Sequence, residues 1–455
     1  MHKIKYLSIY NELKKTILDG TYPIQSKLPS KRILANFYNV SVMTVDNAYQ
    51  QLIAEGYVIS MERKGYYVND LPEHRFFKQG TSILDEHVED ENNISDIQFP
   101  IRLTYFPHHI WAKLSRKVLS DDLNMMDFQV NPQGLIGLRV EIKKYLEIYR
   151  GIHASIDQIV IGSGSQAMMQ LVIALVGRDY TFIMEEPGFP RLKNIIRLSG
   201  MKLLTIEQDD QGIIINKVTG FHPTVLHITP SHQYPTGKVM PVGRRIECLN
   251  WSILDEHRYI IEDDYDSEFR YQGQPIPAVQ SLDKSSKVIY MNTFSKSLSP
   301  ALKINYLVLP KTLMNAYHNI KSVMPCSVPI FEQKVLLEFM KEQHFERHLN
   351  KVKKIYRKKA LYIIDKFKNE KLIKISGHET GLHMILTFDS KIEISALDLI
   401  FYQQSVHLQK LNYFYDNEPK EGRDYMFEYT SLDDDEIAKT VEIIIQALNE
   451  QKKSF

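Results

Sequence analysis

Three short motifs carry side chains that together suit one cofactor. Residues 293–297, Thr-Phe-Ser-Lys-Ser, place the Lys296 amine among hydroxyl groups, and a lysine amine can form a Schiff base with an aldehyde. Asp263 follows the apolar run 259–262, and a carboxylate there can pair with a protonated pyridinium nitrogen. Residues 161–166, Ile-Gly-Ser-Gly-Ser-Gln, form a glycine-rich turn whose free N–H groups suit a phosphate. These three chemistries combine in pyridoxal phosphate, the cofactor that the motifs indicate.

Each motif has an ordinary structural explanation when it stands alone. A glycine-rich turn is often only a turn, an acidic stretch is often a solvated loop, and a serine–lysine pair is common on protein surfaces. Their positions argue for a site, because each motif follows a short apolar run of the kind that forms a buried strand. These runs are residues 159–161, 181–185, 224–229, 259–262, 287–291 and 306–310.

The elements between these runs predict the fold that positions the motifs. Helical stretches such as 166–176 and 242–256 separate the apolar runs, and repeated strand–helix units form a mostly parallel, doubly wound α/β sheet. Ligands bind outside the carboxyl ends of the strands in such a sheet. We therefore predict a large cofactor-binding domain over residues 97–310 and a smaller α+β lobe over residues 311–455.

A small basic module precedes this body. Residues 1–69 contain nine Lys and Arg against five Asp and Glu, whereas the whole chain has a net charge of +1. Three helical stretches and two short strands around the turn 62–65 predict a winged helix-turn-helix, with a basic protein-interaction module as the alternative. Residues 70–96 hold two basic and eight acidic residues, which predicts a flexible acidic linker.

The N-terminal module resembles the GntR family of bacterial DNA-binding domains. The resemblance is carried by residues 27–35, Lys-Leu-Pro-Ser-Lys-Arg-Ile-Leu-Ala, and by residues 55–58, Glu-Gly-Tyr-Val, in register with the helices between them. It implies binding to double-stranded operator DNA. The implied contacts are Ser30, Lys31, Arg32, Ser41, Met43, Thr44, Asn47, Lys64 and Gly65. Val42 stands where the family commonly has arginine, so we expect a half-site that is less centred on guanine.

The body resembles the fold-type I, class I aminotransferases from about residue 98 to residue 455, and the whole chain resembles the MocR subfamily of GntR-type regulators. The resemblance implies a pyridoxal 5'-phosphate Schiff base at Lys296, with Asp263 at the ring nitrogen and Tyr265 at the ring oxygen. The other implied cofactor-binding residues are Gly164, Ser165, Gln166, Phe189, Thr293, Ser295 and Lys303. Arg191 matches the position that binds an effector carboxylate in GABA-responsive members.

Four positions depart from the aminotransferase pattern. Tyr234 replaces the asparagine that contacts the cofactor oxygen, Lys303 replaces a phosphate-binding arginine, and Gln129 replaces a tyrosine that serves the partner subunit. In the C-terminal segment 425–431, we assign the position of the arginine that holds a substrate α-carboxylate to Ser431. Arginine is suited to planar carboxylate recognition, so we predict a domain that senses a small molecule and has no catalytic residues of its own.

These observations predict a cytoplasmic, homodimeric transcriptional regulator whose DNA-binding modules are exchanged between subunits. Pyridoxal 5'-phosphate itself is the preferred effector, with control of vitamin B6 synthesis genes, because only Arg191 remains to anchor a carboxylate. A GABA-like amino-acid sensor is the alternative, and an active aminotransferase or a cofactor-free DNA-binding scaffold is less favoured. Two cysteines and no long apolar run predict no disulfide framework, no metal cluster and no membrane partner.

Overall fold

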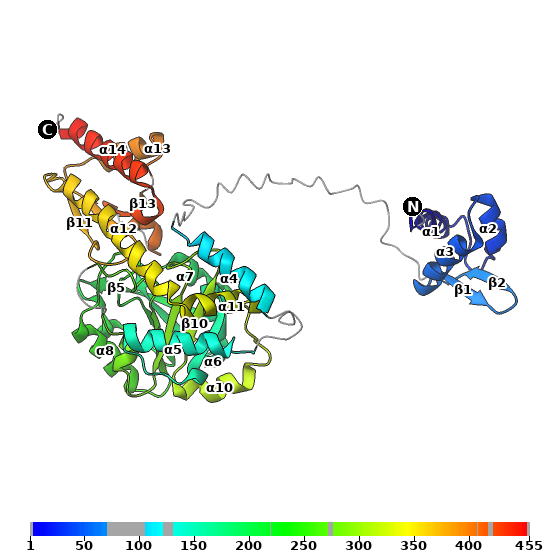
Figure 1. Cartoon of the computed structure of the whole chain (residues 1–455), viewed down its shortest axis with the longest axis horizontal. Helices are drawn as coiled ribbons and strands as arrows, with labels where there is room; N and C mark the ends of the chain where they lie inside the picture. The colour runs from blue at the N-terminus through cyan, green and yellow to red at the C-terminus, as the bar shows by residue number, and fades with distance from the viewer. Residues whose placement is uncertain are drawn as a thin grey trace. The chain divides into compact units, whose positions relative to one another are not determined.

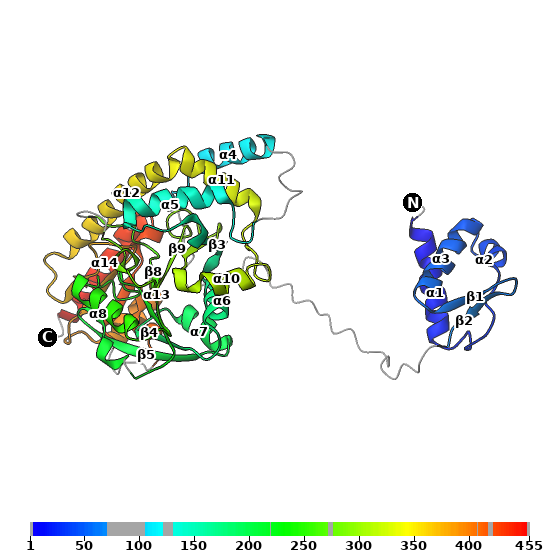
Figure 2. The ribbon, with the colours of Figure 1, turned by 90° about the horizontal axis from the view of Figure 1, so that it is seen from below.

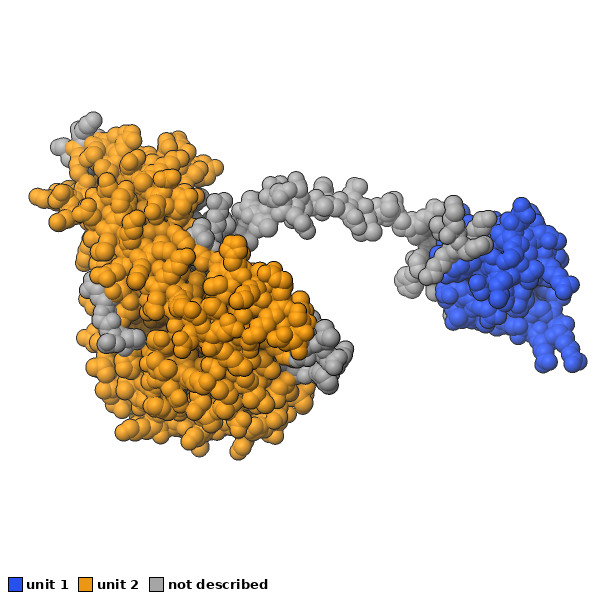
Figure 3. All heavy atoms as spheres, in the orientation of Figure 1, with its two compact units in different colours: residues 1–96 blue, residues 97–455 orange. Residues whose placement is uncertain are grey.

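The computed structural model describes residues 3–70, 105–121, 131–218, 220–271, 276–406, 408–416 and 422–452. Two units of this chain, residues 1–96 and 97–455, are coloured separately in Figure 3. The predicted linker lies outside the described residues except for Asp70, and so does Gln129. Among the described residues, no helix combines the length and the apolar character needed to cross a membrane.

The N-terminal unit is a three-helix module with a hairpin, as the sequence predicts. Its elements are α1 (Lys3–Leu18), α2 (Lys31–Phe37), α3 (Val42–Ala54), β1 (Val58–Met61) and β2 (Gly65–Val68). Ser30 and Ser41 are N-caps whose hydroxyl groups accept the N–H groups of Ile33 and Thr44 at 3.4 and 3.2 Å. The buried Tyr49 donates its hydroxyl hydrogen to the carbonyl of Pro29 at 2.6 Å, which ties α3 to the start of α2.

The second unit is built on an eight-stranded mixed sheet with the order β3-β10-β9-β8-β7-β4-β5-β6. The strands are β3 (Ile159–Ser163), β4 (Thr181–Glu186), β5 (Lys202–Asp209), β6 (Gly212–Ile213), β7 (Thr224–Ile228), β8 (Arg258–Asp263), β9 (Val288–Thr293) and β10 (Ile304–Val308). Within this sheet, β10 and β6 run antiparallel to the strands beside them, and the other pairs are parallel. The carboxyl ends of β3, β8 and β9 therefore lie at one edge, where the three motifs begin.

Helices cover both faces of this sheet because alternate strand residues are apolar on each side. One face packs Ile161, Tyr290 and Tyr306 against α5 (Ile136–Arg150), α11 (Ile330–Lys341) and α12 (His344–Phe367). The other packs Val160 and Leu307 against α6 (Gly164–Val176) and α7 (Pro190–Leu198). The two sets of helices lie on opposite sides in Figure 2. The other α-helices described before residue 321 of this unit are α4 (His108–Asp121), α8 (Val242–Ile253), α9 (Val279–Leu282) and α10 (Met314–Ile320).

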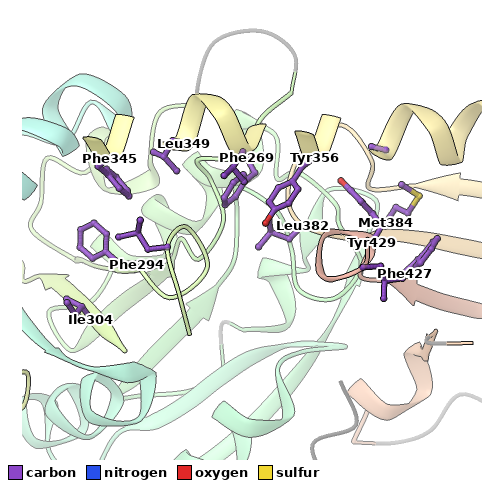
Figure 4. Packing of buried hydrophobic residues seen from close by; sticks show 14 of the residues in the cluster. Phe269, Phe294, Ile304, Phe345, Leu349, Tyr356, Leu382, Met384, Phe427 and Tyr429 are labelled. Atoms are coloured by element: carbon purple, nitrogen blue, oxygen red, sulfur yellow. The ribbon is translucent and has the colours of Figure 1, made fainter. Parts of the chain in front are cut away.

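A smaller antiparallel sheet, in the order β11-β12-β14-β13, forms the C-terminal lobe with α13 (Ile394–Gln403) and α14 (Asp434–Lys452) (Figure 1). Its strands are β11 (Ile373–Ser376), β12 (Met384–Phe388), β13 (Gln409–Lys410) and β14 (Asp424–Phe427). One buried cluster runs from Ile304 of the large sheet through Tyr356 to Phe427 of the small one (Figure 4). This shared core fixes the end of β14 relative to the large sheet.

Candidate functional site

The turn after β9 presents Lys296. Within it, the hydroxyl of Thr293 accepts the N–H of Ser295 at 3.0 Å and donates to the side chain of Asn305 at 3.1 Å on the neighbouring β10. The Lys296 side chain is 26% exposed, and its Nζ lies 3.9 Å from Oε1 of Glu428, just after β14. The lysine is therefore accessible, and it faces a carboxylate that the sequence motifs did not reveal.

Asp263 ends β8, and a histidine on the adjacent strand holds its carboxylate. Nε2 of His227, in β7, lies 3.3 Å from Oδ2 of Asp263, and the His227 side chain is almost fully buried. The parallel register pairs His227 with Ile261, two residues before the aspartate. Sequence reasoning missed this partner, although a lone histidine inside the apolar run 224–228 was a signal.

Tyr265 borders a polar network formed with the buried side chains of His232 and Asp266. Its hydroxyl is 3.1 Å from Nδ1 of His232, which is 2.7 Å from Oδ2 of Asp266. Burial raises the pKa of Tyr265 well above its usual value, so the phenol is neutral in this environment. The sequence predicted Tyr265 but not His232, because the histidine belongs to a loop 33 residues earlier.

The implied phosphate-binding residues gather around the start of α6. Gly164 opens this helix with φ +73°, and its N–H donates to the Lys303 carbonyl at 2.8 Å, because β10 pairs with β3. Ser165 and Gln166 occupy the first turn of the helix. A Cβ added at Gly164 would meet nothing within 4 Å, so this helix start faces open space. The Gly164 N–H is engaged by Lys303, and the hydroxyl of Ser165 with the N–H groups of the first turn fits a phosphate.

Aromatic rings form a wall beside these groups. Phe189, the N-cap of α7, meets the ring of Tyr234 edge-on at a centroid distance of 5.3 Å, and Tyr234 meets Tyr265 and Phe414 at 5.7 and 5.4 Å. Burial is the main cause that raises the pKa of Tyr234, and the charge of Glu428 adds to it. The wall therefore contains Phe189, which is predicted to stack on the cofactor, and Tyr234, one of the four positions that depart from the aminotransferase pattern.

The structure does not bring Arg191 into this group. Arg191 is exposed in the first turn of α7 and forms no hydrogen bond or ion pair with any described residue. The buried cation of α7 is Lys193, which donates to Glu186 at 2.5 Å and to the carbonyl of Phe414 at 3.1 Å. The structure thus leaves Arg191 available but gives it no partner at the site.

The implied DNA-binding residues lie at the two helix starts and the wing. Arg32, Met43, Asn47 and Lys64 are exposed, and Met43 is 68% exposed. The Lys31 amine is different, because it is paired with Asp46 and stacked over a tyrosine ring within the module. Its charge is therefore partly neutralised before any phosphate approaches. The assignment of individual DNA contacts stays a prediction.

The large mixed sheet, with a lysine-bearing turn, a strand-end aspartate and a helix start at one edge, is that of an aminotransferase-like domain of fold type I. Solved structures agree on the fold. The α-aminoadipate aminotransferase LysN from Thermus thermophilus superimposes with a TM-score of 0.67 at 22% identity, over 78% of this chain and 91% of that one. Residues 108–441 match the aminotransferase class I and II family, and residues 5–68 match the gntR family of bacterial regulatory proteins.

Relatives that align with most of the chain are named as regulators. An uncharacterized HTH-type transcriptional regulator of Bacillus subtilis, YdeL, is 36% identical over 84% of this chain and 83% of its own length. The probable rhizopine catabolism regulatory protein MocR of Rhizobium meliloti is 28% identical over 91% and 88%. The pyridoxine biosynthesis regulator PdxR of Corynebacterium glutamicum is 26% identical over 83% and 82%. The chain belongs to the aminotransferase class I and II family and is a MocR-type HTH transcriptional regulator.

Proposed function

We propose that this regulator binds pyridoxal 5'-phosphate at Lys296 and that the occupancy of this site sets its affinity for operator DNA. When bound, the cofactor supplies an aldehyde carbon for the lysine amine and an electron-withdrawing ring. Asp263, held by His227, would bind the ring nitrogen, and Tyr265, held by His232, would bind the ring oxygen. The start of α6, with Thr293, Ser295 and Lys303, would bind the phosphate.

The observation that carries this proposal is a cofactor donor set that keeps its lysine, its ring-binding aspartate and its tyrosine but has no carboxylate anchor. The segment after β14 presents Glu428 to Lys296, whereas the hydroxyl of Ser431 donates to the Glu428 carbonyl at 2.9 Å. Amino-acid turnover needs a cation at this place to hold an α-carboxylate. We therefore favour a sensor over an aminotransferase and the cofactor itself as the signal. The likeness to PdxR, 26% identical, supports control of vitamin B6 synthesis genes.

An effector acts on DNA binding only through a difference in its affinity for two conformations. Operator affinity of the full-length protein should therefore change when pyridoxal 5'-phosphate is added. Lys296→Ala should remove both the visible absorbance of the lysine-bound cofactor and this response, while DNA binding itself survives. An unchanged absorbance spectrum in Lys296→Ala would refute the cofactor assignment. A response to GABA that requires Arg191 would instead support the amino-acid sensor.

The site and the module also support a homodimer. Fold-type I sites form at subunit interfaces, and two-part operators require paired helix-turn-helix modules. We propose that each module rests on the partner subunit's body. Sedimentation of the cofactor-loaded protein at micromolar concentration should give a dimer, and a monomer would contradict this part of the proposal.

A further inference from the structure

We propose that the cofactor site takes a second ligand, a small organic cation of the diamine class, through Glu428. This inference rests on the proposed function, because it concerns the space beside a loaded Lys296. It goes beyond that function, in which pyridoxal 5'-phosphate is the signal, and it differs from the amino-acid alternative, in which Arg191 would bind a carboxylate. The evidence is the position of the Glu428 carboxylate, the aromatic and apolar residues that pack near it, and the charges of the neighbouring side chains.

Met426 and Phe427, the last two residues of β14, pack in different clusters on the two sides of the small sheet. Met426 of β14 packs with Ile385, Leu411 and Phe414, and Tyr234 packs against this small cluster. Phe427 packs on the opposite side, in the core that joins the two sheets. Glu428 follows β14 directly, and its carboxylate lies 3.9 Å from the Lys296 amine.

Glu428 is positioned to meet a ligand. Its side chain is 23% exposed, which leaves the carboxylate accessible in a region whose neighbours are largely buried. Within the described residues, the contact with Lys296 is the single ion pair of Glu428. In the loaded protein that lysine amine would be committed to the cofactor, which leaves the carboxylate able to pair with another cation.

Other charges near the site do not favour a carboxylate ligand. Lys193 pairs with Glu186 and lies 3.4 Å from Asp416, and the Arg197 guanidinium donates to Asp416 at 2.6 Å. Burial lowers the pKa of His383 well below its usual value, so this neighbour of Lys296 is neutral. A carboxylate placed beside Glu428 would meet a like charge, whereas an ammonium group would meet an opposite one.

The distance between Glu428 and Lys296 limits the length of the ligand. An ammonium within hydrogen-bond distance of Glu428 lies at most about 6.7 Å from the Lys296 amine position, from the 3.9 Å contact plus an N–O distance of about 2.8 Å. A diamine with a short aliphatic chain fits this distance, with one ammonium at Glu428 and the other amine beside the cofactor held by Lys296. Its methylene groups would lie along the apolar wall of Tyr234, Phe414 and Met426.

The test is calorimetry on the full-length protein loaded with pyridoxal 5'-phosphate. The probes are 1,4-diaminobutane and 4-aminobutyrate, which share a chain and differ in one terminal charge. We expect the diamine to bind at least about tenfold more tightly, as one charged hydrogen bond allows. Glu428→Gln should remove this preference and Glu428→Lys should reverse it. Glu442→Gln, an exposed position on α14, should leave it unchanged.

Cofactor absorbance and circular dichroism of each variant show that it is folded and loaded. Equal affinity for the two probes in the loaded wild-type protein, or a preference that survives in Glu428→Gln, would overturn the inference and leave the proposed function intact. A wild-type protein that takes up no cofactor at Lys296 would overturn the proposed function and, with it, this inference. The absorbance measured before any probe is added therefore separates the two failures.

Discussion

A buried ion pair supports the loop that carries Asp263 and Tyr265. Arg150, at the end of α5, places its Nε 2.7 Å from Oδ2 of Asp264, and the two side chains are 3% and 0% exposed. The hydroxyl of Tyr290 donates to the same oxygen at 2.5 Å. Because Asp264 lies between the two predicted cofactor contacts, this pair couples the stability of the fold to the geometry of the site.

Replacing Arg150 with methionine keeps much of the aliphatic side chain and removes its charge. The Asp264 carboxylate is then left buried without its counter-ion, a loss that costs about 3–5 kcal/mol of unfolding free energy. With a urea m-value of about 3 kcal/mol/M, the unfolding midpoint should fall by roughly 1–1.7 M. Cofactor affinity should fall as well, because Asp263 is the neighbouring residue.

Tryptophan fluorescence is the suitable probe, because both tryptophans, Trp111 and Trp251, belong to the second unit. Lys144→Met is the matched control. Lys144 is on the same helix, in an exposed pair with Glu141, and should cost less than about 1 kcal/mol. A cost below about 1 kcal/mol for Arg150→Met as well would refute the reasoning that the pair is buried and structurally required.

The other predictions concern the site and the DNA-binding module. His227→Ala should weaken cofactor binding about 10–100-fold in a spectroscopic titration, because it removes the partner of the ring-binding carboxylate, and unchanged affinity would contradict that role. Arg32→Ala should lower affinity for all DNA sequences and reduce the salt slope by about one, whereas Asn47→Ala should change base preference by about 1–3 kcal/mol; binding isotherms at several salt concentrations distinguish the two. Burial raises the pKa of Glu268 from 4.5 to about 7, so the folded state holds an extra proton between these values and stability should fall as pH rises through this window. Glu268→Gln should flatten this pH dependence of urea unfolding. An unaltered slope would show that other titrating groups cause the pH dependence.

Much of this protein could be predicted from local sequence. Ser30 and Ser41 show the kind of signal that is local, because an N-cap needs only a hydroxyl and the backbone that follows it. Asp263 at the end of β8 and Lys296 in the turn after β9 follow apolar runs that could also be predicted, since apolar runs and polar turns alternate over a few residues. These signals were sufficient for the fold class and for the elements of the candidate cofactor site.

Contacts between distant segments were decided by the tertiary structure alone. Glu428 meets Lys296 because a shared core holds the small sheet against the large one, and nothing near residue 428 encodes that distance; sequence reasoning placed Ser431 at this position instead. Likewise, His227 reaches Asp263 only because β7 and β8 are neighbours in a particular register. Local patterning determines which residues form a strand, but the charge that faces a ligand depends on how separate strands pack together.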